Sequence, residues 1–133
     1  MNAAVRHKEI FVYGTLMSGE MYSEFMERGD LKRLCPARCL GRLYDLGDYP
    51  GMIPGGNLWI AGELYRSSAI EKLLPILDEL EGSHAFERRL VEVDWTHGPT
   101  PAWCWVYTGP VDPSSRIDGG SWRAHRRRQK RHG

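Results

Sequence analysis

The residue that most suggests chemistry is a glutamate near the apolar face of the strongest predicted helix. The segment SSAIEKLLPILDELEG, residues 67–82, gathers its leucines and Ile70 on one side of a helix turning 100° per residue. Glu81 projects toward that side, whereas Glu79 points away from it. Glu81 is therefore paired, or has a pKa raised by desolvation as a general acid or base requires, or extends past the helix end into water.

A second candidate is the corner at which the first expected strand ends. The stretch FVYGTLMSGE, residues 11–20, breaks from an apolar run into Gly-Thr. Backbone N–H groups at such a corner can hold an anion or a polarised carbonyl oxygen, although a plain turn has the same composition. This stretch alone leaves both interpretations open.

The cysteines offer little chemistry. Their number is three, which argues against a disulfide framework. Cys35 and Cys39 have no second closely spaced pair, so we expect no metal site. A nucleophile built from Cys104 and His84 is conceivable, but neither residue has a local activating context.

The elements that must position these residues belong to one α+β domain. Strands are expected at residues 9–13, 58–66, 87–95 and 102–108, with strand-like stretches also in residues 37–47. A short helix is expected within residues 18–29, and residues 49–56, YPGMIPGG, are expected to be a turn-rich loop. Gly62 indicates a bulge or a close backbone approach. Strands followed by one dominant helix and more strands predict a mainly antiparallel or barrel-like sheet.

The net charge of +1 combines an acidic body with a basic end. Six of the 18 Lys and Arg residues lie in SWRAHRRRQKRHG, residues 121–133, which contains no acid. The other 12 face 17 acids, so residues 1–120 carry a net charge of about −5. We expect residues 1–124 to form the domain and residues 125–133 a disordered tail that folding does not need. Only through this tail could the chain contact nucleic acid or an acidic partner.

Length and composition limit the protein class. A chain of 133 residues, 41% hydrophobic and 26% charged, suits a single globular domain. It contains no run of roughly 18 apolar residues and begins without a signal-peptide pattern. We therefore expect a cytoplasmic protein with no membrane partner.

Both candidate sites carry motifs that resemble those of a known family. YGTL (13–16) ends the first expected strand, and LDELEG (77–82) ends the main helix. Together they resemble the γ-glutamylcyclotransferase-like family, which includes γ-glutamylamine cyclotransferases and small AIG2-like proteins. Further landmarks follow in the family's order: YPGMI, GELYR, RRLVEV, WVY and GGSWR.

The resemblance implies a fold and an activity. The fold is a small mixed, mostly antiparallel β-barrel flanked by helices. The activity is intramolecular: the α-amine of a γ-glutamyl group attacks its own γ-carbonyl and releases 5-oxoproline and an amine. It implies a small γ-glutamyl substrate and neither a cofactor nor a metal.

The resemblance also assigns residues. It makes Glu81 the general acid and base, and it makes Tyr13, Gly14, Thr15 and Leu16 the loop that holds the glutamyl end. Further candidate pocket residues, which could equally be turn or core residues, are Tyr49, Pro50, Gly51 and Tyr107.

Two residues depart from the family pattern. Phe86 stands where a tyrosine is frequent, and Ser121 replaces a more usual acid before Trp122. Missing the phenol at Phe86 removes one possible hydrogen bond near the pocket. Two alternatives to the enzyme stay open: a non-catalytic module that binds a small carboxylate, and a nucleic-acid-associated protein acting through the tail. Oligomeric state is not indicated.

Overall fold

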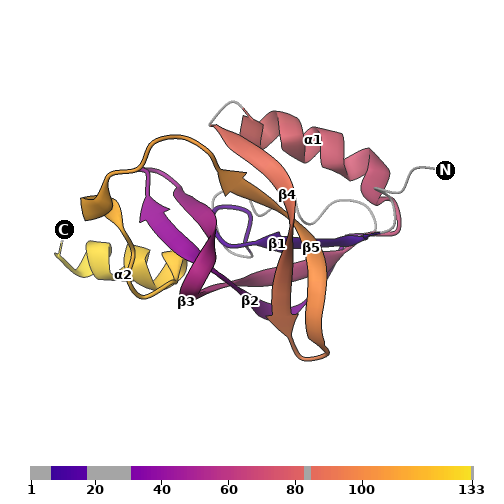
Figure 1. The fold of residues 1–133 in the computed structure, drawn as a ribbon, viewed down its shortest axis with the longest axis horizontal. Helices are drawn as coiled ribbons and strands as arrows, with labels where there is room; N and C mark the ends of the chain where they lie inside the picture. Colours follow the sequence, from indigo (N-terminus) through magenta and orange to yellow (C-terminus); the bar gives the residue numbers. More distant parts are fainter. Residues whose placement is uncertain (1–6, 18–30, 83–84, 133) are drawn as a thin grey trace.

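The architecture is a closed five-stranded barrel with a helix on either side (Figure 1). The computed structural model describes residues 7–17, 31–82 and 85–132, so the helix expected within residues 18–29 lies outside the described residues. The strands, in barrel order, are β1 (Glu9–Val12), β3 (Pro50–Arg66), β2 (Lys32–Asp45), β4 (Phe86–Trp95) and β5 (Gly98–Tyr107). Helix α1 (Ile70–Gly82) follows β3, and α2 (Trp122–His132) ends the chain after a short 3₁₀ turn, Pro113–Ser115.

The sheet is mixed and mostly antiparallel. Every strand pairing is antiparallel except that of β1 with β5, where Ile10 opposite Trp103 closes the barrel. The predicted α+β barrel flanked by helices is therefore confirmed. None of the helices in the described part of the chain is both long and apolar enough to span a bilayer.

The loop expected at residues 49–56 is instead the first half of β3. Residues 50–54 pair with β2, up to Pro54 opposite Gly41, and the next paired position is Trp59 opposite Leu40. The residues between Pro54 and Trp59 bulge out, and Gly55 and Gly56 adopt positive φ values of 103° and 87° there. Glycine reaches this backbone region without steric penalty, so the composition that predicted a turn instead allows a bulge within a long strand.

Gly62 allows the close approach that its position in the strand predicted. A Cβ atom on Gly62 would overlap the carbonyl oxygen of Val12 and the ring of Phe11. The absence of a side chain at Gly62 therefore lets the end of β1 lie closely against β3 at this point.

Helix α1 lies against the barrel through the predicted apolar face. Ile70, Leu74 and Leu77 are buried, and Leu73 and Leu80 pack against the core. Helix α1 continues through Pro75 and ends at Gly82, with Glu79 exposed. The helical periodicity of the sequence thus predicted correctly which side of α1 faces the barrel.

The tail expected to be disordered forms α2, so that prediction was wrong for the described residues up to 132. The hydroxyl of Ser121 accepts a hydrogen bond from the Ala124 N–H (3.1 Å), which caps the first turn. Trp122 is 1% exposed, and His125 and Gln129 both bind Asp45 at the end of β2. These contacts offset the repulsion among the arginines, so the helix is docked.

Candidate active site

The corner after β1 is a tight turn. The Met17 N–H donates to the carbonyl of Gly14 (3.0 Å), which places Thr15 and Leu16 at the centre of a β-turn. Among the described residues, no carbonyl accepts from the N–H groups of these two central residues. Gly14 lies against Pro50, because a Cβ there would come within 2.6 Å of the Pro50 ring. The corner therefore presents backbone donors and has no space for a larger residue at position 14.

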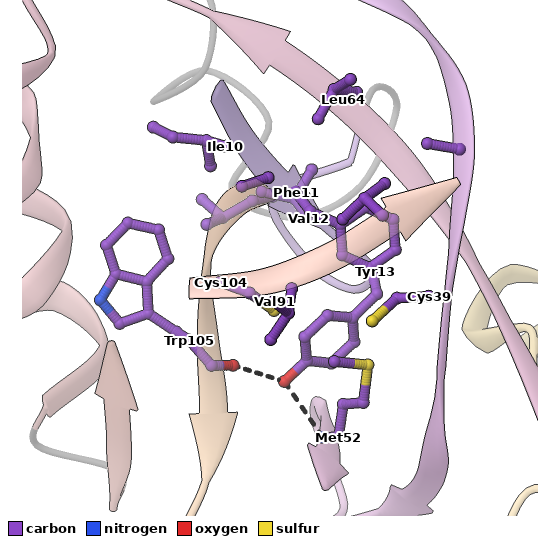
Figure 2. Close-up of a cluster of buried hydrophobic side chains, with 14 of the residues drawn as sticks. Ile10, Phe11, Val12, Tyr13, Cys39, Met52, Leu64, Val91, Cys104 and Trp105 are labelled. Atoms are coloured by element: carbon purple, nitrogen blue, oxygen red, sulfur yellow. Dashed lines mark hydrogen bonds between the residues drawn. The ribbon is translucent and has the colours of Figure 1, made fainter. Parts of the chain in front are cut away.

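Tyr13 ties this corner to the barrel wall. Its hydroxyl donates to the carbonyl of Trp105 on β5 (2.8 Å) and accepts from the Met52 N–H on β3 (3.1 Å). Figure 2 shows both bonds, with the Tyr13 ring among the buried side chains inside the barrel. Burial raises the pKa of this phenol well above its ordinary value, so it stays neutral. Its hydroxyl is committed to the scaffold, and Tyr13 serves the site as an anchor.

A pocket of about 200 Å³ opens beside the corner. It lies between the corner, the end of α1, the loop before β3, and residues of β4 and β5. Its lining residues are Phe11, Val12, Tyr13, Gly14, Thr15, Leu16, Asp48, Tyr49, Pro50, Leu80, Glu81, Phe86 and Trp105. This size and mainly apolar lining suit a small molecule.

Glu81 is the unusual group in this pocket. Burial raises the pKa of its carboxyl from 4.5 to about 7. No described residue gives Glu81 a hydrogen bond or an ion pair. Desolvation without a partner keeps the acid and carboxylate forms close in energy at neutral pH, so the group can both accept and donate a proton.

The end of α1 that carries Glu81 is fixed by its neighbour Asp78. The Trp105 indole N–H donates to Asp78 Oδ1 (2.9 Å), and Arg88 Nε lies 3.5 Å from the same oxygen. These contacts join α1 to β5 and β4 one helical turn before Glu81. They help to determine where the glutamate enters the pocket, and they come from strands 10 and 27 positions further along the chain.

Aromatic rings form one wall of the pocket entrance. The ring of Phe86 lies 5.9 Å from that of Tyr49 and 5.4 Å from that of Tyr107, centroid to centroid, both edge to face. Tyr49 and Phe86 line the pocket, whereas Tyr107 supports Phe86 from behind. Gly51 also lies behind the wall, because a Cβ on it would come within 2.9 Å of Tyr107 Cβ.

The loop of residues 46–49 beside this wall is closely held. Asp45 accepts from the Gly47 N–H (2.8 Å), and the Leu46 N–H donates to the Tyr49 carbonyl (3.0 Å). Burial by itself would raise the pKa of Asp45, but the hydrogen bonds from His125, Gly47 and Gln129 outweigh burial and lower it. Asp45 therefore stays ionised and connects α2 to the pocket entrance.

The structure brings most of the sequence-derived candidates together. Glu81, the corner residues 13–16, Tyr49 and Pro50 line one pocket, whereas Gly51 and Tyr107 stand in its second layer. Sequence reasoning did not select Phe11, Val12, Asp48, Leu80 or Trp105 as lining residues, and it placed Phe86 near the pocket only as a departure from the family pattern. Asp48 directly precedes the YPGMI motif and Leu80 lies within LDELEG, so their positions could have indicated the pocket. The position of Trp105 gave no such indication, because a tryptophan in a strand usually packs in the core.

Other chemistry finds no support among the described residues. They include no group of three or more His, Cys, Asp and Glu side chains that could hold a metal ion. Cys104 is buried, and burial raises its pKa, which disfavours the thiolate. His84 lies outside the described residues.

Comparison with known proteins finds matches over most of the chain. The family model for "Gamma-glutamyl cyclotransferase, AIG2-like" matches residues 10–124. The Gamma-glutamylcyclotransferase family protein YtfP of Escherichia coli (strain K12) is 35% identical over 121 residues, covering 85% of this chain and 94% of that protein.

Two further matches extend the comparison. The Gamma-L-glutamyl-butirosin B gamma-glutamyl cyclotransferase of Niallia circulans is 35% identical over 106 residues, covering 74% of this chain and 65% of that protein. The crystal structure of an AIG2-like protein from Mus musculus superposes with a TM-score of 0.71 at 21% identity, covering 86% of this chain and 88% of that one. At this identity the mouse protein shows a shared fold.

Proposed function

This chain belongs to the γ-glutamyl cyclotransferase, AIG2-like family, and we propose that it cyclises a γ-glutamyl amine or peptide to 5-oxoproline. Family membership supports a cyclotransferase-like enzyme. The substrate, the product and the roles of individual residues are our proposal.

The reaction forms one C–N bond and breaks another within the substrate. The neutral α-amine attacks the γ-carbonyl carbon and closes a five-membered ring. The carboxylate of Glu81 takes a proton from the attacking nitrogen, and the resulting acid gives a proton to the departing nitrogen. The bond to the leaving amine then breaks, the products are 5-oxoproline and the free amine, and Glu81 returns to its starting form.

The corner after β1 can supply hydrogen-bond donors for the oxygen atoms of the substrate. The N–H groups of Thr15 and Leu16 can donate to the substrate carboxylate or to the oxygen that becomes negative during attack. The substrate carries its own nucleophile, so the pocket has to fold it into a reactive geometry rather than capture a second reactant. A turn fixed by Gly14 against Pro50 and by the Tyr13 hydroxyl is suited to this task.

One observation carries the proposal: the half-buried carboxyl of Glu81, which has no partner among the described residues and a pKa of about 7, lines the same pocket as that corner. A desolvated acid without a compensating partner destabilises a fold, so its presence in a pocket points to a functional role. Proton transfer in a pocket of substrate size supplies that reason.

The test is a panel of γ-glutamyl dipeptides and γ-glutamyl amines, assayed for 5-oxoproline release. Glu81→Gln should lower turnover of the best substrate by at least about 10²–10⁴-fold, because the amide cannot accept or return the proton. Glu79→Gln, two residues before Glu81 on the exposed face of α1, is the matched control and should retain turnover. A Glu81→Gln enzyme of near wild-type rate would overturn the proposed role.

A further inference from the structure

We propose that Asp48 makes this site selective for γ-glutamyl amines whose leaving group carries a positive charge. The inference rests on the proposed function, because it concerns the part of the substrate that the reaction releases.

The charge of the pocket is the first observation. Among the described residues that line it, the ionisable acids are Glu81 and Asp48, and no lysine, arginine or histidine is present. The glutamyl end of the substrate belongs beside Glu81, where ring closure takes place. Asp48 is thus the acid left for the rest of the substrate.

Asp48 differs from the acids around it in having no partner within the part of the chain that the structure describes. Asp45 is bound by His125 and Gln129, and Asp78 is bound by Arg88 and Trp105. Asp48, in contrast, is exposed and makes no hydrogen bond or ion pair with any described residue. An unpaired carboxylate at a pocket entrance attracts cations and repels anions.

Burial places Asp48 where the pocket meets solvent. Among the described lining residues Asp48 is the exposed one, and Tyr49 beside it and Phe86 are half-buried, whereas Tyr13 and Trp105 are 7% and 4% exposed. A leaving group that extends from Glu81 toward solvent therefore passes Phe86, Tyr49 and Asp48. The faces of aromatic rings attract ammonium groups, so this wall adds to the preference for a cation.

The loop that carries Asp48 is held rather than free. The Gly47 N–H is bound by Asp45 (2.8 Å), and the Leu46 N–H by the carbonyl of Tyr49 (3.0 Å). These bonds bracket position 48 from both sides. Because the backbone at position 48 is held, only the side chain of Asp48 has to be ordered when a ligand binds, which favours discrimination between ligands.

The experiment compares three γ-glutamyl amides of similar length that differ in terminal charge. They are the amides of 1,4-diaminobutane (cationic), n-pentylamine (neutral) and 4-aminobutanoate (anionic). At low ionic strength kcat/KM should fall in that order, by about two- to fivefold at each step, as expected for an exposed ionic contact. The differences should shrink as salt is raised to about 0.5 M.

Asp48→Asn should bring the cationic-to-neutral ratio of kcat/KM close to one. Asp118→Asn, which makes the same change of charge at an exposed position outside the pocket lining, should leave the ratio as in the wild type. Equal effects of both substitutions would show a general field effect and overturn the role of Asp48.

Binding of the three amides to the Glu81→Gln variant, measured by calorimetry, separates this inference from the proposed function. Charge-ordered binding without any turnover by the wild type would overturn the function and keep the inference. Turnover of all three amides at rates that do not depend on their terminal charge would overturn the inference and keep the proposed function. An enzyme that neither binds nor converts the amides would overturn both.

Discussion

The imidazole Nε2 of His125 lies 2.8 Å from Oδ2 of Asp45, joining the C-terminal helix to the end of β2 across 80 positions of sequence. The same oxygen accepts from Gln129 (2.9 Å), while Oδ1 accepts from the Gly47 N–H (2.8 Å). Asp45 is thus shared between α2 and the loop that leads to Asp48 and Tyr49. The helix packs on the barrel opposite the α1 side (Figure 1) and contributes to the pocket entrance through this one carboxylate.

His125→Ala should lower the free energy of unfolding by about 1–2 kcal/mol, because a part-buried, charge-assisted hydrogen bond is lost. Arg127→Ala, on an exposed position of the same helix, should change it by less than about 0.5 kcal/mol. Urea unfolding at pH 7 measures both. A larger loss for Arg127→Ala would contradict the proposed contact.

The same variant should respond less to acid than the wild type. The lowered pKa of Asp45 contributes stability above the pKa of an unfolded aspartate, about 3.9. That contribution is lost as pH falls through the lower pKa of the folded state. Unfolding free energies of wild type and His125→Ala should therefore converge as pH is lowered from 6 to 3.

Deletion of residues 125–133 should destabilise the protein. It removes His125 and Gln129 from Asp45 and leaves the buried Trp122 at the chain end. A loss of about 1–2 kcal/mol lowers the Tm of a domain of this size by roughly 3–10 °C. The control is Arg127→Ala with Arg131→Ala, which keeps the docked face. An unchanged Tm in the deletion would restore the expectation of a dispensable tail.

Glu81→Gln should raise stability in a pH-dependent manner. The pKa of Glu81 is raised from 4.5 to about 7. The stability that this raised pKa contributes is therefore fully present below pH 4.5 and is lost as pH rises through 7. Glutamine does not ionise, so the variant does not lose this stability. The unfolding free energy of the variant minus that of the wild type should therefore grow between pH 5 and pH 8, by about 1–3 kcal/mol. A difference independent of pH would contradict the raised pKa.

Gly14→Ala should reduce both stability and activity. The added Cβ would come within 2.6 Å of the Pro50 ring, so the corner or the start of β3 must move, at a cost of about 1–3 kcal/mol. Gly82→Ala is the matched control, since a Cβ there meets no atom of the described residues within 4 Å. Thermal unfolding and 5-oxoproline release on the panel's best substrate measure the two effects.

Local pattern was sufficient for much of the fold. The apolar periodicity of residues 70–80 predicted the face of α1 that is buried, and Gly62 predicted a close backbone approach. It failed where glycine and proline were ambiguous: YPGMIPGG has turn composition, yet pairs with β2 for most of its length. It also failed at α2, where a run of arginines concealed the Ser121 cap and the buried Trp122.

By itself the sequence determined the family, the barrel class, and the presence of an acid on the apolar side of the main helix. These depend on contiguous motifs and on helical periodicity, which act within a few residues. Only the tertiary structure decided that Glu81 lines the same pocket as Thr15 and Leu16, and that Asp48 stands at its entrance. It also showed that α2 binds Asp45. Such contacts join positions far apart in the chain, and strand register and helix docking bring them together only after the whole barrel has closed.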